Sequence, residues 1–101
     1  MERGGYTYIM TNNAKKPLYI GVTSNLAERT WQHKTNHFKG SFTTIYNLHK
    51  LVYYEDFDSI AEAISREKQL KRWHRNWKLN LIESTNSDFK DLYDYIKDNC
   101  T

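Results

Sequence analysis

Two short runs of strand-forming residues lie near the N-terminus, with a cluster of turn formers between them. The runs are Tyr6–Met10 and Leu18–Val22, and the segment between them contains asparagine, lysine and proline. This spacing predicts an antiparallel hairpin with a loop of moderate length. With the loop centred between residues 13 and 14, Tyr8 falls opposite Tyr19, and cross-strand partners share one face of a sheet. The hairpin is therefore expected to place two phenol side chains side by side.

Two helices have clear N-terminal signals. Asn25, with Glu28 three residues later, has the spacing of a capping box, and Ser59 shows the same pattern before a second helix. On the first of these helices, Arg29 and His33 share the face of Asn25, because residues four apart are neighbours. The sequence thus predicts a basic and a titratable side chain on one helix face.

The remaining segments add one strand and two more helices. Lys50 begins a run rich in valine and tyrosine that predicts the strand, whereas residues 37–47 have no clear period and are interpreted as a loop. This order of elements predicts an α+β fold, a small antiparallel three-stranded sheet flanked by helices. The strand is predicted over 50–55, and the helices are predicted over 26–34, 60–73, 76–82 and 89–97.

Length and composition fit one globular domain. The chain has 101 residues, of which 39% are hydrophobic and 27% charged. We expect a single domain over 1–101, with a core over about 6–82 and a helical tail over 83–101. No apolar run approaches the roughly 20 residues that span a bilayer, so no membrane association is expected. The one cysteine, Cys100, predicts neither an internal disulfide nor a four-ligand zinc site by itself, which is typical of a soluble cytoplasmic protein.

Positive charge is concentrated in the first four-fifths of the chain. Residues 1–50 hold seven lysines or arginines against two acids, whereas the residues from Glu83 onward hold two against five. A polyanionic partner fits the main body of the chain. On charge alone, an ordinary solvated surface fits nearly as well.

Glu67 is the most informative position of the second predicted helix. On a helical wheel, it falls inside the apolar stripe. A carboxylate in such a stripe is unfavourable unless it is paired, hydrogen-bonded or bound to a metal. Glu67 is therefore a candidate metal ligand or one half of a partly buried ion pair with Arg29 or another base, and the helix alone favours the ion pair. The stripe consists of Ile60, Ala63, Ile64 and Leu70.

The segment 66–78 interleaves six lysines or arginines with two tryptophans. Such interleaving suits nucleic acid, because cations meet phosphates and rings stack on unpaired bases. For Trp73 and Trp77 we favour a role as core anchors of a helix pair. For the basic residues, a nucleic-acid contact and a solvated face are equally supported. The candidate nucleic-acid-binding residues are Lys68, Lys71, Arg72, Arg75 and Lys78.

The other chemistry-bearing residues exclude several classes of function. The four histidines lack a metal-binding spacing such as His-Glu-x-x-His, which argues against a histidine metal site. The chain has no Gly-rich phosphate loop, nucleophile elbow or pair of cysteines. The common hydrolase, kinase and redox classes are therefore not predicted.

Five elements, in this order and spacing, resemble the GIY-YIG nuclease superfamily. They are Tyr6-Thr7-Tyr8-Ile9, Tyr19-Ile20-Gly21, Arg29, His33 and Glu67, and the stretches 18–29 and 63–71 are specific to it. The resemblance covers about residues 6–82. It is nearest to the small stand-alone branch that resembles the N-terminal endonuclease domain of an excinuclease.

The resemblance implies a role for each matched residue. Tyr8 and Tyr19 match the tyrosines of the two motifs, which lie side by side on the sheet. Arg29 matches the arginine that contacts the scissile phosphate, and His33 matches a position that orients the nucleophile or takes its proton. Glu67 matches the carboxylate that holds a single divalent cation, usually Mg²⁺ or Mn²⁺. The choice among Tyr8, Tyr19 and His33 as proton acceptor stays open.

Three positions depart from the pattern of the superfamily. The first motif reads Tyr-Thr-Tyr in place of Gly-Ile-Tyr, although its last tyrosine is kept. Val22 stands where some relatives have a lysine, so the missing charge would have to come from Lys68 or Lys71. Asn80 is matched with an asparagine that many relatives carry beyond the glutamate.

The resemblance implies a metal-dependent DNA endonuclease that hydrolyses phosphodiester bonds, in repair or in the processing of branched or damaged DNA. The alternative is a nucleic-acid-binding module of the same fold that does not cut, or cuts only with a partner, and RNA is a weaker candidate substrate. Relatives that cut specific sites carry a separate DNA-binding domain, for which this chain has no room. This indicates low sequence specificity or recruitment by a protein partner.

Overall fold

The computed structural model describes residues 4–35 and 46–99 of the chain. Most of the loop predicted over 37–47 and the thiol of Cys100 lie outside the described residues. The elements are β1 (Gly5–Thr11), β2 (Tyr19–Thr23), α1 (Leu26–Lys34), β3 (Lys50–Phe57), α3 (Ile60–Arg72), α4 (Arg75–Thr85) and α5 (Tyr93–Asn99).

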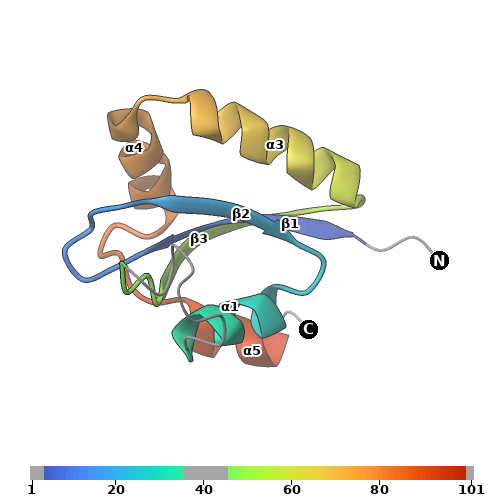
Figure 1. Cartoon of the computed structure of the whole chain (residues 1–101), viewed down its shortest axis with the longest axis horizontal. Coiled ribbons are helices and arrows are strands. Elements are labelled where there is room, and N and C mark those ends of the chain that lie inside the picture. Colours follow the sequence, from blue (N-terminus) through green and yellow to red (C-terminus); the bar gives the residue numbers. More distant parts are fainter. Residues whose placement is uncertain (1–3, 36–45, 100–101) are drawn as a thin grey trace.

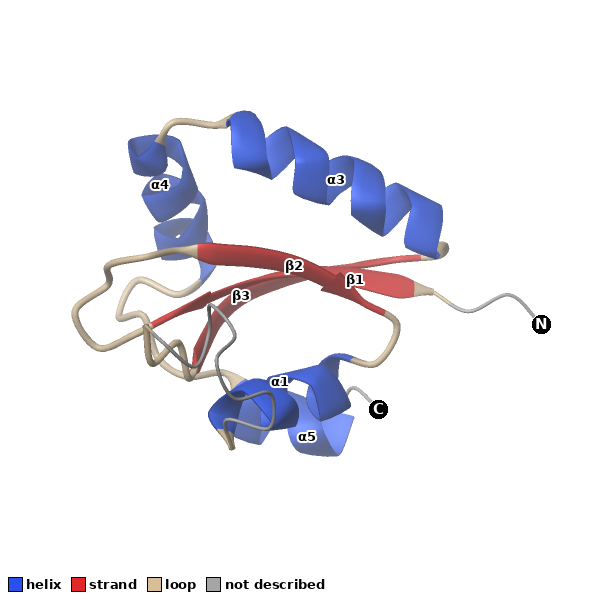
Figure 2. Ribbon diagram, viewed as in Figure 1, coloured by secondary structure: helices blue, strands red, loops and turns tan. Residues whose placement is uncertain are grey.

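The strands form an antiparallel sheet in the order β2-β1-β3. Helices α3 and α4 lie on one side of the sheet, and α1 and α5 lie side by side on the other (Figures 1 and 2). The predicted α+β fold, a three-stranded antiparallel sheet flanked by helices, is confirmed. None of the helices in the described part of the chain is long and apolar enough to cross a bilayer.

Each face of the sheet carries its own apolar core, because successive strand residues point to opposite faces. On β1, Ile9 belongs to the core beneath α3 and α4, and Tyr8 and Met10 belong to the core against α1 and α5. A bulge in β3, opposite the step from Ile9 to Met10, inserts Val52 as an extra residue. The buried residues of the α3 side include Ile20, Val52, Leu70 and Ile82, and those of the α1 side include Leu26, Leu48, Leu51 and Ile96.

The register of the hairpin differs from the predicted one by two residues. Tyr8 pairs with Gly21 and Tyr19 pairs with Met10, so the predicted pairing of Tyr8 with Tyr19 is wrong. The loop is centred one residue later than predicted, around a turn in which the Lys15 amide donates to the Asn12 carbonyl at 3.0 Å. A shift of two residues keeps every side chain on its face. The two tyrosines therefore remain neighbours, as diagonal partners.

The predicted starts of the first two helices, α1 and α3, are confirmed at atomic detail. The Asn25 side chain accepts a hydrogen bond from the Glu28 amide at 3.1 Å, and the Ser59 hydroxyl accepts one from the Glu62 amide at 3.2 Å. The Glu28 carboxylate accepts from the Asn25 side-chain amide, whereas the Asn25 backbone amide donates to the Thr23 hydroxyl. The cap of α1 is thus a variant of the predicted capping box.

Helix α3 turns a narrower apolar face toward the sheet than its sequence predicts. Ala63 and Leu70 are fully buried, but Ile60 and Ile64 are 40% and 38% exposed. The helix touches β1 at Ala63, whose carbonyl accepts a hydrogen bond from the Thr7 hydroxyl at 2.7 Å. The buried arc is therefore centred between Ala63 and Leu70, and the two isoleucines lie at its rim.

The C-terminal helix begins later than predicted. It starts at Tyr93 and not at Phe89, because Phe89 has a φ of 53°, which ends any helical path at that residue. The carboxylate of Asp91 then accepts hydrogen bonds from the amides of Leu51 and Tyr93 and forms an ion pair with Lys34. These contacts hold the tail against β3 and α1.

Candidate active site

Four of the five predicted catalytic residues meet on the α1 side of the sheet. The hydroxyl of Tyr8 lies 3.0 Å from Nε2 of His33. The ring centroids of Tyr8 and Tyr19 are 6.2 Å apart, and those of Tyr19 and His33 are 5.6 Å apart. Arg29 interacts with the hydroxyls of both tyrosines. The structure thus joins residues separated by up to 25 positions into one polar cluster.

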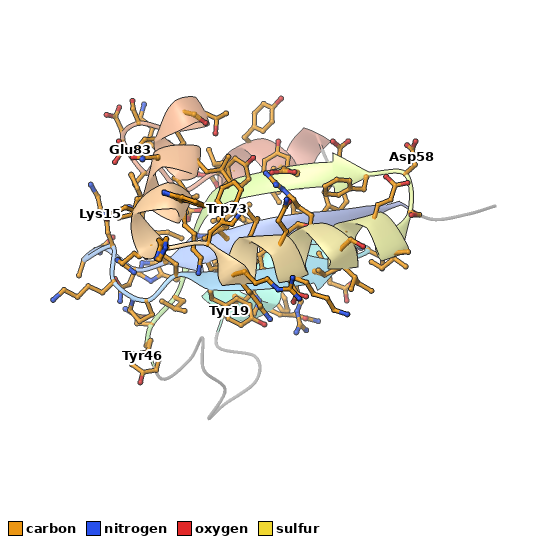
Figure 3. The ribbon with its side chains drawn as sticks, turned by 90° about the horizontal axis from the view of Figure 1, so that it is seen from above. Lys15, Tyr19, Tyr46, Asp58, Trp73 and Glu83 are labelled. Atoms are coloured by element: carbon orange, nitrogen blue, oxygen red, sulfur yellow. The ribbon has the colours of Figure 1, made fainter. Side chains whose placement is uncertain are left out.

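The elements place these side chains at different depths. Tyr8 comes from the central strand and is 1% exposed, whereas Tyr19 comes from the edge strand β2 and is half-buried. Figure 3, which looks down on α3, shows Tyr19 at the outer edge of the sheet. Arg29 and His33 share one face of α1, as predicted, and the buried Leu26 and Thr30 anchor that helix against the sheet. Tyr19 is therefore the more accessible of the two phenols.

Gly21 makes room for the Tyr8 hydroxyl. It lies directly opposite Tyr8 in the hairpin, and a Cβ at this position would be 2.5 Å from the hydroxyl oxygen and 2.6 Å from Cζ. Contacts this short require something to move. Because Tyr8 is buried among packed side chains, the ring has little space to retreat.

We expect Gly21→Ala to destabilise the protein by about 1–3 kcal/mol, because overpacking a buried site forces side chains out of their rotamers. Urea unfolding monitored by circular dichroism measures the change. Ser24→Ala, an exposed position just after β2, serves as the control and should shift the free energy of unfolding by no more than about 0.5 kcal/mol. Equal stability of Gly21→Ala and Ser24→Ala would contradict the close contact.

The local environment keeps both Tyr8 and His33 uncharged at neutral pH. Burial, and secondly the neighbouring Tyr19, raises the pKa of Tyr8, with Arg29 opposing the shift. Burial, and secondly the charge of Arg29, lowers the pKa of His33 to about 4. At neutral pH the phenol is therefore protonated and the imidazole is neutral. Nε2 of His33 is then free of charge and can accept the Tyr8 proton.

The low pKa of His33 predicts a pH-dependent stability. The unfolded chain binds a proton near pH 6.5 and the folded chain only near pH 4, so folding is favoured above pH 6.5 and loses this contribution as the pH falls from 6.5 to 4. The loss should be about 3 kcal/mol. Denaturant unfolding at a series of pH values measures it, and His33→Gln should flatten this part of the curve. An unchanged slope in His33→Gln would assign the pH dependence to other groups.

Glu67 lies on the other side of the sheet, on α3, and forms an ion pair with Lys71. The distance from Lys71 Nζ to Glu67 Oε2 is 3.1 Å, and the Glu67 side chain is 20% exposed. The predicted ion pair is therefore present, with Lys71 in place of Arg29. Lys71 also lines a hollow of about 360 Å³ together with Tyr19 of the edge strand. Lys71 therefore links Glu67, with which it is paired, to the hollow at the edge of β2 that Tyr19 also lines.

Residues 4–80 match the family of GIY-YIG catalytic domains. The chain belongs to the GIY-YIG family. Members of this family are nucleases, and they generally use a divalent metal. The chain is 35% identical to a UPF0213 protein of Syntrophus aciditrophicus over 77% of this chain and 88% of that protein. It is 40% identical to one of Clostridium perfringens over 78% of this chain and 83% of the relative.

A solved structure shares the fold. The solution NMR structure of a UPF0213 protein from Bacillus halodurans superposes with a TM-score of 0.54 and 22% sequence identity, over 97% of this chain and 99% of that one. At this identity the likeness concerns the fold alone. The GIY-YIG membership predicted from five sequence elements in order and spacing is confirmed by the family match.

Glu67 is the carboxylate that the resemblance assigns to a cation, and in this structure it is paired with Lys71. Among the residues that the structure describes, no three His, Cys, Asp or Glu side chains form a metal cluster. Glu67 is one carboxylate that reaches solvent, and Mg²⁺ commonly binds through one or two carboxylates, retained waters and substrate phosphate. A single carboxylate is compatible with a hydrated cation that waters and a substrate phosphate complete, once its ion pair with Lys71 is broken.

The basic segment lies largely on the surface. Of the five candidate nucleic-acid-binding residues, Lys78 is half-buried and the other four are exposed. Trp73 packs partly against the core, but Trp77 is 56% exposed and meets Trp73 edge-on, with ring centroids 5.9 Å apart. Trp73, which is labelled in Figure 3, is a core anchor as predicted. The same interpretation is wrong for Trp77.

Sequence reasoning missed two residues that shape the site. Gln32 accepts a hydrogen bond from Arg29 Nη1 at 3.2 Å and restrains the guanidinium. Its spacing of three residues from Arg29 is the signal that could have identified it. Gly21 leaves space for Tyr8, and its position in the second motif could have pointed to a close contact.

Proposed function

We propose that this chain is a divalent-metal-dependent endonuclease that hydrolyses phosphodiester bonds in DNA. One observation carries the proposal: in a member of a nuclease family, a neutral histidine lies 3.0 Å from a buried tyrosine hydroxyl, next to a second tyrosine and an arginine. Such a cluster supplies a proton acceptor and a positive charge at one place, and hydrolysis of an anionic ester requires both.

The contacts of the cluster support a path from the attacking water to His33, although burial and the charge of Arg29 destabilise the imidazolium that forms at its end. Tyr19 is half-buried at the edge of the sheet, Tyr8 lies behind it, and the Tyr8 hydroxyl lies 3.0 Å from Nε2 of His33, which accepts its hydrogen bond when the neutral imidazole carries its proton on Nδ1. The water transfers its proton to Tyr19, Tyr19 passes its own proton to Tyr8, and Tyr8 passes its own proton to Nε2 of His33. Both phenols end the step neutral, so neither has to become a stable phenolate, which the burial of Tyr8 disfavours.

Arg29 stabilises the phosphoryl oxygens, where negative charge develops in the transition state. Gln32 fixes the guanidinium from one side. Glu67 would hold the Mg²⁺ or Mn²⁺ ion, which when bound neutralises charge on the leaving oxygen. Lys68, Lys71, Arg72, Arg75 and Lys78 would contact the phosphates of the flanking DNA.

We further propose that the substrates are branched or damaged DNA, as in repair, with little sequence specificity. The basic residues are phosphate contacts, which position DNA without reading its sequence. A protein partner would then direct the enzyme to its sites.

The test is an incubation of the purified protein with end-labelled single-stranded, duplex, flap and four-way-junction DNA, and with RNA of the same sequence. Mg²⁺, Mn²⁺ or EDTA is present in parallel reactions. We expect metal-dependent nicks in DNA, most of them in the branched substrates. Binding of all substrates without cleavage in any metal would instead support the nucleic-acid-binding module.

A further inference from the structure

We propose that Lys71 is a positioning residue that couples cation binding at Glu67 to phosphate binding at the edge of β2. In the free protein Lys71 neutralises Glu67. When a divalent cation takes the carboxylate, Lys71 is released and turns to the phosphate. This inference rests on the proposed function, because it assumes a cation at Glu67 and a phosphodiester at Tyr19.

The first observation is the ion pair itself. Lys71 lies one helical turn after Glu67, and its ammonium is 3.1 Å from Oε2. The carboxylate is 20% exposed, so a second ligand can approach it, and the lysine side chain is 56% exposed. A cation that binds Glu67 therefore competes with a lysine already in place.

Lys71 also contributes to a hollow at the edge of β2. Its side chain lines the hollow at the edge of β2, together with Leu18, Tyr19, Ile20 and Lys78. Tyr19 belongs to the polar cluster with Tyr8 and His33. Lys71 thus borders both Glu67 and the hollow at the edge of β2, which Tyr19 also lines.

The exchange requires little free energy. The ion pair joins residues four apart on one helix, and its lysine side chain is 56% exposed, so water competes strongly for the ammonium and in part for the 20%-exposed carboxylate. A divalent cation at Glu67 repels the ammonium of Lys71, and a phosphate in the hollow attracts it. Each ligand then favours the other, so cation and DNA bind cooperatively, and linkage makes this effect reciprocal.

Titration of the full chain with Mn²⁺ in the absence of DNA tests the competition, with the free ion measured by electron paramagnetic resonance. We expect Lys71→Met to bind Mn²⁺ roughly 5-fold more tightly than the wild type, because no lysine has to be displaced. Lys71→Arg keeps the charge and should bind as the wild type does. Lys97→Met is the control for the loss of one lysine charge, because Lys97 forms a more exposed ion pair, with Asp94, on the distant helix α5.

A second measurement tests the coupling. Affinity for a labelled DNA duplex is measured with and without Ca²⁺, and the gain on adding Ca²⁺ should be several-fold larger in the wild type than in Lys71→Met. Identical Mn²⁺ affinity and an identical gain in both proteins would overturn the role of Lys71. Glu67→Gln separates this outcome from failure of the proposed function: if it binds Mn²⁺ as tightly as the wild type, the cation is not held at Glu67.

Discussion

Replacing Glu67 by glutamine is expected to reduce the single-turnover rate of DNA cleavage at least about 1,000-fold. Glutamine keeps the size and shape of the side chain but removes the negative charge that would hold a divalent cation. The lost charge neutralisation at the leaving oxygen corresponds to several kcal/mol of transition-state stabilisation. Because glutamine is isosteric with glutamate and the partner of Glu67 in the ion pair, Lys71, is exposed, the fold should remain intact.

The matched control is Glu62→Gln on the same helix. Glu62 is exposed in the first turn of α3, so its change removes the same charge at a distance from the hollow. We expect it to cleave at the wild-type rate. Thermal unfolding of both variants verifies that they fold. A Glu67→Gln variant that cleaves within about 10-fold of the wild type would remove Glu67 from the catalytic site.

Replacing Arg29 by alanine should have the second largest effect, a loss of roughly 100- to 1,000-fold in cleavage rate with a small change in DNA affinity. This is the loss expected for one donor aimed at developing charge. The substitution should also change the pH profile. The charge of Arg29 is the second cause that holds the pKa of His33 low, so its removal raises that pKa toward the ordinary value. The acid limb of the rate profile should therefore move to higher pH.

Arg72→Ala distinguishes this catalytic effect from a loss of phosphate binding. Arg72 is exposed at the end of α3, in the basic segment. Its removal should weaken binding of all DNA sequences about equally and reduce the salt dependence of binding by about one charge. The rate of the bound complex should stay unchanged. If Arg29→Ala behaved in the same way as Arg72→Ala, Arg29 would be a binding residue only.

The elements of the fold were predictable because their signals are local. Asn25 and Ser59 cap their helices with their own side chains, so the predicted starts at residues 26 and 60 are confirmed. The helix beginning at Tyr93 was not predictable in the same way. Its late start follows from the left-handed backbone of Phe89 and from Asp91, whose carboxylate accepts hydrogen bonds from the amide of Leu51, 40 residues away, as well as from that of Tyr93.

The register of the hairpin shows why a local error can leave a site intact. The turn around Asn12 and Lys15 moves the pairing by two residues, yet Tyr8 and Tyr19 stay on one face because strands repeat every two residues. A shift of one residue would have separated them. The grouping of the tyrosines is therefore more robust than the register from which it was predicted.

The depth of each side chain could not be predicted from the pattern alone. A helical wheel places Ile60, Ile64 and Glu67 in one stripe, but the close contact of Ala63 with β1 decides which side of the stripe is covered. Whether Trp77 is buried likewise depends on the packing of α4 after α3, and the periodicity of α4 alone does not show it. Such outcomes depend on packing between elements distant in sequence, which overrides the periodicity of any one helix.

The most direct test of the proposed function is the cleavage of one end-labelled flap DNA by the purified wild-type chain, in Mn²⁺ and in excess EDTA, with DNA binding measured on the same samples. We predict strand cleavage in Mn²⁺, none in EDTA, and binding in both. Binding without cleavage in Mn²⁺ would contradict the endonuclease function and leave the chain as a nucleic-acid-binding member of a nuclease family.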